Sequence, residues 1–310
     1  MRVAAIDIGT NSVLLLIANK TPTSSLEPLV ELSTITRLGQ QVDRTRSLHP
    51  DAVSRTLACL RSYAQLLQQH AVDRLAVVAT SASRDAQGAD SFLHQAREIL
   101  GVAPAIISGE REALLTFAGA LSALPVQGPV AVQDVGGGST ELVTGQVQDG
   151  VARVHSAVSL DIGSVRMTER FLGSDPPSPQ QLHAASEHVR EVLANAPVAR
   201  AEMTWVGIAG TITTLAAVQL GLERYDAAVV HGSTLSVAQV RALRDRLAAM
   251  PLSQRRAVAG LEPKRADGIV AGALIAAEVL ERAGASHMLV SDRGVRWGLA
   301  LELAEPGWQP

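Results

Sequence analysis

The spacing of apolar and polar residues changes along this chain and marks out strands and helices in turn. Each half opens with short apolar runs separated by tight polar turns, which is typical of consecutive strands. Apolar residues then recur every three or four positions, as in helices that cover a sheet. In the first half we expect strands over residues 2–7, 12–19, 27–35, 75–79 and 105–107, and helices from Pro50 and over 89–100 and 109–121.

The second half of the chain repeats this plan. Three strands followed by alternating helices and strands, done twice, indicate an α/β architecture. The Pro- and Gly-containing segment 124–129 interrupts the pattern, so we predict domains over 1–125 and 126–310, with the final helix able to pack back on the first domain. We expect strands over 130–134, 140–147, 151–159, 205–208 and 288–290, and helices over 163–172, 179–195, 236–249, 265–283 and 294–303, with one more starting at the turn 209–211.

Composition narrows the class of protein. The 310 residues are enough for two domains, and 47% hydrophobic against 18% charged residues indicates packed cores. Cys59 is the only cysteine, which excludes a disulfide framework and a thiolate metal cluster. A net charge of −3 provides no basic field for nucleic acid, and no apolar stretch approaches the length of a membrane span. We therefore expect a cytoplasmic protein without a signal peptide and without nucleic acid or membrane partners.

The most informative segment of the chain is a run of three glycines followed by a serine. Gly136, Gly137 and Gly138 stand between two apolar runs, and such a run is costly to order. Backbone N–H groups in a glycine turn can surround an anion, and the Ser139 hydroxyl adds a further donor. We therefore interpret the segment as a phosphate-binding turn, with a purely structural turn as the alternative.

Two carboxylates flank the glycine run. Asp134 leaves the incoming strand and Glu141 lies on the outgoing one. Carboxylate oxygens are ligands that Mg²⁺ accepts alongside substrate phosphates. The pattern thus predicts that Asp134 carries Mg²⁺ or its water shell and that Glu141 orients a water.

A second turn of the same kind lies near the start of the chain. Asp7 leaves the first strand, and Gly9, Thr10 and Asn11 form the turn before the next strand. On its own this segment is compatible with an ordinary β-turn. Its similarity to the glycine run favours a second phosphate-binding turn, as in a cleft that grips phosphate from two similar lobes.

Two further segments carry possible phosphate contacts. Gly210 and Thr211 follow a buried strand and open a helix, whose N-terminus attracts anions, although a simple helix cap is also possible. Arg84 follows another strand within a run of hydroxyl residues, and its planar guanidinium suits phosphate oxygens. An N-cap cluster would have the same composition.

A general base is also available. Glu110 and Glu112 lie in the first turn of a predicted helix, where acids are favoured by the helix dipole alone. Glu112 points away from the apolar arc of that helix, so it is either a solvated residue or a base facing a cleft. Dinucleotide-binding, P-loop, zinc-ligand and nucleophile-elbow motifs do not occur in the sequence.

Taken together, these motifs resemble the exopolyphosphatase / guanosine pentaphosphate phosphohydrolase (Ppx/GppA) family, in its short two-domain form. The likeness runs nearly end to end and keeps the order of the family's segments. The segments that carry it are 7–12, 37–39, 79–86, 108–113, 134–141, Gly163 with Arg166, 207–214, 265–267 and 291–298.

The resemblance implies two ribonuclease-H-like domains of the actin-like ATPase superfamily, with the active site in the cleft between them. It implies Mg²⁺-dependent hydrolysis of the terminal phosphoanhydride of inorganic polyphosphate by in-line attack of water. Guanosine pentaphosphate (pppGpp) or another nucleoside polyphosphate is the alternative substrate. Two-domain members of this kind also lead us to expect a homodimer.

The resemblance assigns roles to individual residues. Glu112 falls on the family's catalytic glutamate, and Glu141 assists it by holding the lytic water. Asp134, Glu141 and Asp7 form the Mg²⁺ site. Phosphate binding falls on Gly9, Thr10, Asn11, Arg84, Gly136, Gly137, Gly138, Ser139, Gly210 and Thr211. Two other functions stay open, a kinase of the same superfamily and a phosphate or alarmone sensor.

Overall fold

The computed structural model describes residues 1–21, 25–197 and 202–306. The chain forms two compact units, each with its own sheet. Unit 1 contains residues 1–119 and the carboxyl-terminal segment from Val295, and unit 2 contains residues 120–294. The first division therefore falls a few residues before the predicted boundary at 125/126, and the last helix is grouped with unit 1.

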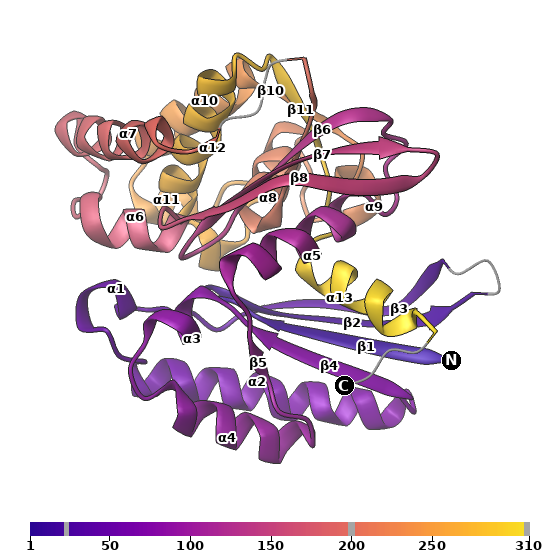
Figure 1. The fold of residues 1–310 in the computed structure, drawn as a ribbon. Helices are drawn as coiled ribbons and strands as arrows, with labels where there is room; N and C mark the ends of the chain where they lie inside the picture. Colours follow the sequence, from indigo (N-terminus) through magenta and orange to yellow (C-terminus); the bar gives the residue numbers. More distant parts are fainter. Residues whose placement is uncertain (22–24, 198–201, 307–310) are drawn as a thin grey trace. The chain divides into compact units, whose positions relative to one another are not determined.

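Unit 1 is built on a five-stranded sheet with the order β3-β2-β1-β4-β5 (Figure 1). The first three strands are antiparallel, whereas β4 runs parallel to β1 and β5 runs parallel to β4. The strands are β1 (Arg2–Ile8), β2 (Ser12–Lys20), β3 (Leu26–Ile35), β4 (Arg74–Ala79) and β5 (Ala105–Ile106).

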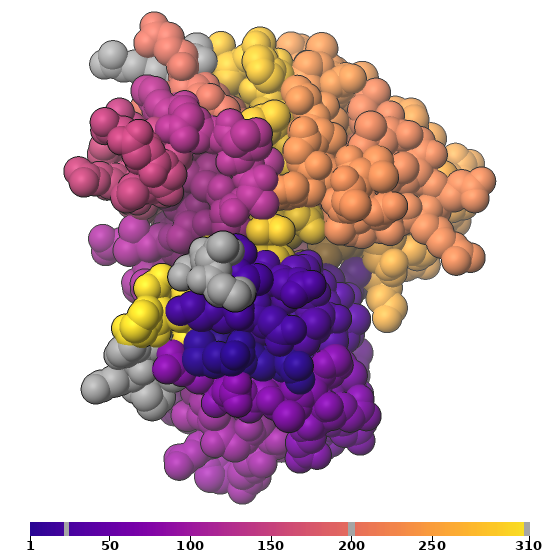
Figure 2. Space-filling model, turned by 90° about the vertical axis from the view of Figure 1, so that its right-hand side faces the viewer, coloured from indigo at the N-terminus to yellow at the C-terminus, as the bar shows by residue number. Residues whose placement is uncertain are grey.

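Helices cover both faces of this sheet. Successive side chains of β1 point to opposite faces and are all buried from Val3 to Ile8, so both faces must be covered. Ala4, Ile6 and Ile8 join a core with α2 and α4, while Val3 and Ala5 face the other way and pack with α13. The carboxyl-terminal helix contacts β1 and β2, and yellow atoms lie beside indigo ones in the space-filling view (Figure 2). The helices of unit 1 are α1 (Val42–Thr45), α2 (Pro50–Gln69), α3 (Ser81–Asp85), α4 (Ala89–Leu100), α5 (Gly109–Leu121) and α13 (Val295–Ala304).

Unit 2 repeats the same strand order with one strand added at the edge. Its sheet has the order β8-β7-β6-β9-β11-β10, so β6, β7, β8, β9 and β11 correspond to β1 to β5 of unit 1. The ribonuclease-H-like topology predicted for both halves is thus confirmed. The strands are β6 (Gly128–Val135), β7 (Thr140–Gln148), β8 (Val151–Leu160), β9 (Thr204–Ile208), β10 (Thr234–Ser236) and β11 (His287–Val290).

The core of unit 2 surrounds α12, which is buried over most of its length. The predicted helix over 265–283 starts only at Ile269, because residues 263–265 form a 3₁₀ turn that begins with a proline. The remaining helices of this unit are α6 (Ser164–Phe171), α7 (Pro179–Ala194), α8 (Ala209–Gln219), α9 (Ala227–Val230), α10 (Val237–Ala248), α11 (Leu252–Arg255) and η1 (Pro263–Arg265). Within the described ranges, no helix has both the length and the apolar character needed to cross a bilayer.

Candidate active site

The two predicted Asp–Gly turns have the same construction. In unit 1 the Gly9 N–H donates to the Ser12 carbonyl at 2.9 Å, and in unit 2 the Gly136 N–H donates to the Ser139 carbonyl at 3.0 Å. A Cβ at Gly9 or Gly136 would lie only 3.1 or 3.0 Å from that carbonyl oxygen. A side chain at either position would crowd this carbonyl oxygen, so both turns favour glycine here.

The segment after β3 holds the turn of unit 1 through backbone hydrogen bonds. The Thr10 carbonyl accepts from the Gly39 N–H at 2.8 Å, and the Asn11 carbonyl accepts from the N–H groups of Thr36 and Arg37 at 3.1 and 2.9 Å. Thr10 itself is buried. The turn is thus held rigidly, although sequence alone indicated no structural role for Thr10 or Asn11.

The glycine turn of unit 2 presents a set of backbone donors. Within the described part of the chain, the N–H groups of Gly137, Gly138 and Ser139 donate no hydrogen bond to a protein acceptor. Gly138 and Ser139 are nevertheless buried, and buried donors of a native protein normally have a partner. Successive N–H groups of this kind can form a nest that binds an anion, which is the arrangement expected for a phosphate-binding turn.

The predicted metal ligands of unit 2 are direct neighbours. Asp134 at the end of β6 pairs with Glu141 on β7 in the antiparallel register, so both side chains lie on one face of the sheet. Asp134 is 8% exposed and Glu141 1% exposed. The Ser159 hydroxyl donates to Glu141 Oε1 at 2.7 Å and orients that carboxylate. Two buried acids directly opposite each other repel, and a cation between them would relieve the repulsion.

This pair fits Mg²⁺ in the way that phosphoryl-transfer enzymes hold it. Mg²⁺ keeps several waters and is bound by one or two carboxylates together with substrate phosphates. Over residues 1–21, 25–197 and 202–306, no three or more His, Cys, Asp and Glu side chains gather into a metal-binding group. The third predicted ligand, Asp7, belongs to unit 1 and is also buried.

The predicted general base lies in unit 1 beside the predicted phosphate-binding arginine. Arg84 Nη1 donates to Glu112 Oε2 at 3.3 Å and to the Ile107 carbonyl at 2.7 Å. The Glu112 side chain is 9% exposed and the Arg84 side chain 27% exposed. The interpretation of Glu112 as a solvated residue is therefore wrong, because its side chain is buried and accepts a hydrogen bond from Arg84. Glu110, two residues earlier on α5, is exposed.

The third predicted phosphate contact, at the start of α8, contains a strained residue and a nearby cation. Ala209 has φ of 68°, in the left-handed region that non-glycine residues seldom occupy. A Cβ at Gly210 would meet the guanidinium of Arg265, with Nη2 at 2.6 Å. Burial lowers the pKa of Arg265 below its ordinary value, and Glu262 opposes this shift. The helix N-terminus and a guanidinium therefore meet beside Thr211.

Sequence reasoning assigned no role to Arg166 or Arg265. Arg166 is buried on α6, and its Nε donates to the Gly138 carbonyl at 2.7 Å. Both arginines lie in segments that match the family, but a single arginine without a glycine turn of its own gives no separate signal. Their roles depend on contacts between segments far apart in the sequence.

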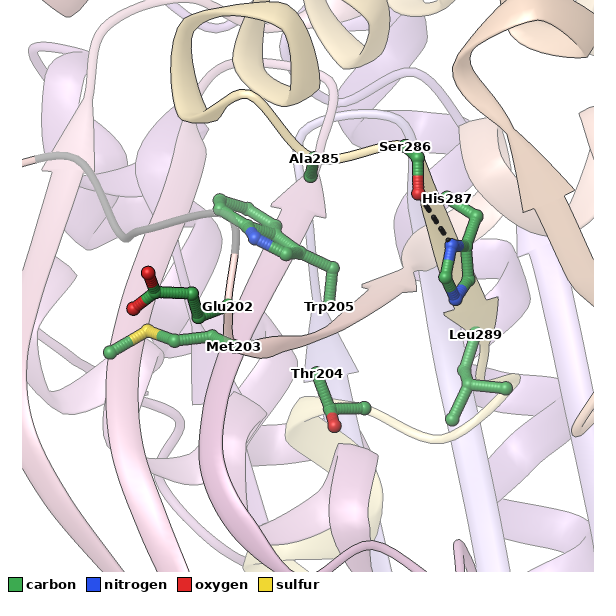
Figure 3. A pocket seen from close by; sticks show the side chains of 8 residues that line it. All are labelled: Glu202, Met203, Thr204, Trp205, Ala285, Ser286, His287 and Leu289. Carbon is green, nitrogen blue, oxygen red and sulfur yellow. Dashed lines mark hydrogen bonds between the residues drawn. The ribbon is translucent and has the colours of Figure 1, made fainter.

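A surface pocket of about 250 Å³ lies at the amino ends of the parallel strands β9 and β11 of unit 2 (Figure 3). It is lined by Thr204 and His287, where β9 and β11 begin, and by the indole of Trp205. The predicted site residues instead follow the carboxyl ends of β6 and β9. Since these strands are parallel, the pocket lies away from the candidate site and contains none of its residues.

Paired Asp–Gly turns on two ribonuclease-H-like units, with buried carboxylates beside an anion nest, define an enzyme that handles phosphoryl groups. Comparison with known proteins identifies the family. Residues 16–306 match the Ppx/GppA phosphatase family, and the chain belongs to it.

Relatives with known names support this assignment over almost the whole chain. The chain is 42% identical to Exopolyphosphatase 2 of Mycobacterium tuberculosis, over 98% of both proteins. It is 36% identical to the crystal structure of an exopolyphosphatase-like protein, with a TM-score of 0.91 and 97% of each chain covered. A Ppx/GppA family member from Aquifex aeolicus is 35% identical, with a TM-score of 0.82 over 97% of this chain and 96% of that one.

Proposed function

We propose that this protein is an exopolyphosphatase, which releases the terminal phosphate of inorganic polyphosphate by in-line attack of water. One observation carries the proposal. Three backbone N–H groups that meet no acceptor among the described residues adjoin the opposed carboxylates Asp134 and Glu141, in a member of the Ppx/GppA family. Donors for phosphate oxygens and ligands for a phosphate-bound cation are the parts that phosphoryl transfer requires.

The terminal phosphoryl group is held mainly by backbone donors. In this proposal the N–H groups of Gly137, Gly138 and Ser139 bind its equatorial oxygens, where negative charge is spread in the transition state. Arg84 supplies a positive charge from unit 1. The other phosphate contacts in the proposal are Gly9, Thr10, Asn11, Gly136, Gly210 and Thr211.

Asp134 and Glu141 would hold Mg²⁺, with Asp7 as a third ligand from unit 1. When bound, the cation neutralises phosphate charge and so favours attack by water. Glu141, which Ser159 orients, also positions the lytic water. Glu112 then accepts a proton from that water at a carboxylate oxygen.

A nucleoside polyphosphate is the second candidate substrate. In this proposal the glycine turn and the opposed carboxylates bind only phosphate oxygens and the cation. They do not select for or against a nucleobase, so they suit pppGpp as well as polyphosphate. A cytoplasmic location and a homodimer belong to the same proposal and are tested by cell fractionation and light scattering.

The test measures phosphate release with Mg²⁺ from short and long polyphosphate, pppGpp and ATP, side by side. We expect release from polyphosphate and a loss of about 10²–10⁴-fold in kcat for Glu112→Gln, the range for removing a general base. Glu110→Gln is the matched control, because Glu110 lies on the same helical turn but is exposed. It should keep the wild-type rate.

Three outcomes would contradict the proposal. Equal loss in both variants would mean that Glu112 is not the base. Transfer of phosphate from ATP to an acceptor, without release to water, would favour a kinase. Binding of every ligand without turnover would favour a sensor.

A further inference from the structure

We propose that Arg166 is a positioning residue, which fixes the direction in which the glycine turn of unit 2 presents its N–H groups. The inference rests on the proposed function in one respect, that the anion bound by this turn is a phosphoryl group. Its structural basis is a row of hydrogen bonds between the turn and the start of α6.

The first residues of α6 bind all three carbonyl groups of the glycine run. The Gly136 carbonyl accepts from the Ser164 N–H at 2.9 Å and from its hydroxyl at 3.1 Å. The Gly137 carbonyl accepts from the N–H groups of Val165 and Arg166 at 2.9 and 3.1 Å. The Gly138 carbonyl also accepts from α6, through the Arg166 side chain. Three successive carbonyls therefore point toward α6.

The direction of these carbonyls determines the direction of the donors. In a trans peptide the C=O of one residue and the N–H of the next point opposite ways. The N–H groups of Gly137, Gly138 and Ser139 consequently point away from α6. This is why they form one concave set and meet no protein acceptor in the described chain.

The third carbonyl is held differently from the first two. Backbone donors bind the carbonyls of Gly136 and Gly137, whereas the Gly138 carbonyl accepts from the Arg166 side chain, through Nε at 2.7 Å. Arg166 is 7% exposed, so little water competes for this bond. The orientation of the Gly138–Ser139 peptide therefore depends on a single guanidinium.

The Gly138–Ser139 peptide needs the Arg166 hydrogen bond because glycine itself does not restrict its orientation. A residue without a Cβ occupies φ of either sign at similar energy, so a peptide beside Gly138 can turn over. A turned peptide would present a carbonyl oxygen, rather than the Ser139 N–H, to a phosphate. Asp161 Oδ1 lies 3.9 Å from Arg166 Nη2 and is largely exposed, so this ion pair holds the guanidinium only weakly.

The corresponding turn of unit 1 has no need of such a side chain. There, among the residues that the structure describes, the carbonyls of Thr10 and Asn11 accept from the backbone N–H groups of Thr36, Arg37 and Gly39 and from no side chain. Thr10 and Asn11 carry side chains that restrict φ, whereas the equivalent positions of unit 2 are Gly137 and Gly138. Arg166 thus replaces, in unit 2, the conformational restriction that glycine removes.

Amide NMR with inorganic phosphate as the probe tests this directly. In the wild type we expect phosphate to shift the amide signals of Gly137, Gly138 and Ser139. In Arg166→Gln the shift of Ser139 should be lost while that of Gly137 remains, because Gly136 keeps its own backbone partners. Arg170→Gln, on the exposed side of α6, is the control and should behave as the wild type.

Kinetics with polyphosphate separates positioning from stability. We expect Arg166→Gln to lower kcat on the order of 10²-fold, as for loss of one oxyanion donor, with a smaller change in KM. Arg166→Lys retains the charge and a donor and should recover part of the rate. Added guanidinium should likewise raise the rate of Arg166→Ala, which a loss of folding would not allow.

The outcomes distinguish this inference from the proposed function. An unchanged Ser139 shift in a folded Arg166→Gln variant would overturn the role of Arg166, as would a wild type without shifts at the three amides. An Arg166-dependent shift in a protein that releases no phosphate from any substrate would support the inference and refute the exopolyphosphatase proposal.

Discussion

Replacing Gly298 by alanine should separate two helices of unit 1 and so disturb the candidate base. Gly298 lies on α13, where a Cβ would be 2.7 Å from the carbonyl carbon of Leu115 and 2.9 Å from its Cα, with the carbonyl oxygen nearer still. Ordinary contacts of a Cβ begin at about 3.4 Å. The obstacle is the backbone of α5, which cannot rotate away as a side chain would.

The size of the effect follows from this geometry. To restore ordinary contact, α13 and α5 must move apart by roughly 1 Å, and inserting a methyl group into such packing costs about 1–3 kcal/mol. Glu112 lies three residues before Leu115 on α5, about 4.5 Å along the helix axis. A shift of about 1 Å in a catalytic group can cost 10²-fold in rate.

Thermal unfolding and phosphate release, measured together, check this prediction. We expect Gly298→Ala to lower the Tm by several degrees and kcat by about 10-fold or more, since the shift reaches Glu112 only in part. Gly173→Ala is the matched control, because its Cβ would meet only a side-chain nitrogen at 3.7 Å. A Gly298→Ala variant with the stability and rate of the wild type would refute the link between this contact and Glu112.

Two further predictions concern buried charges of unit 2. Without Mg²⁺, Asp134→Asn should raise the free energy of unfolding by about 0.5 kcal/mol, because it removes a like-charge pair. Added Mg²⁺ should raise the Tm of the wild type but not that of the variant. A variant less stable than the wild type in the absence of Mg²⁺ would contradict this. Arg190→Met should lower the free energy of unfolding, measured with denaturant, by about 2 kcal/mol, because the buried Glu278 (4% exposed) loses two hydrogen bonds of 2.7 and 2.9 Å from Arg190. The double variant with Glu278→Met should recover part of this loss, because it no longer leaves a buried charge unpaired.

Local patterns predicted the strands and turns that carry the candidate site. Each Asp–Gly turn lies between two strands that pair directly, so sequence spacing alone places Asp134 opposite Glu141 across the hairpin. Glycine at positions 9 and 136 is favoured by close contacts within four residues. Such features depend on short stretches of chain, which is why periodicity and turn chemistry were sufficient to find them.

Contacts between distant segments were beyond this reasoning. The Glu112 carboxylate is bound by Arg84, 28 residues earlier, which also donates to the Ile107 carbonyl. The short helices α1, α3, α9 and α11, with four or five residues each, span too little of a helical repeat to show a period. Arg166 and Arg265 reach backbone at Gly138 and Gly210 across gaps that no motif spans.

The two units share a topology but differ in the Asp–Gly turn that each presents after its first strand. In both, the segment after the third strand holds the carbonyls of the turn, so its N–H groups face the other way. In unit 1 the turn keeps the side chains of Thr10 and Asn11, which limit how closely the backbone can approach a ligand. In unit 2, Gly137 and Gly138 remove that limit, and a buried arginine supplies the lost rigidity. The unit with the bare turn also carries the opposed carboxylates, whereas Glu112 and Arg84 belong to the other. Under the proposed function, unit 2 therefore supplies the backbone donors and unit 1 supplies the candidate base Glu112.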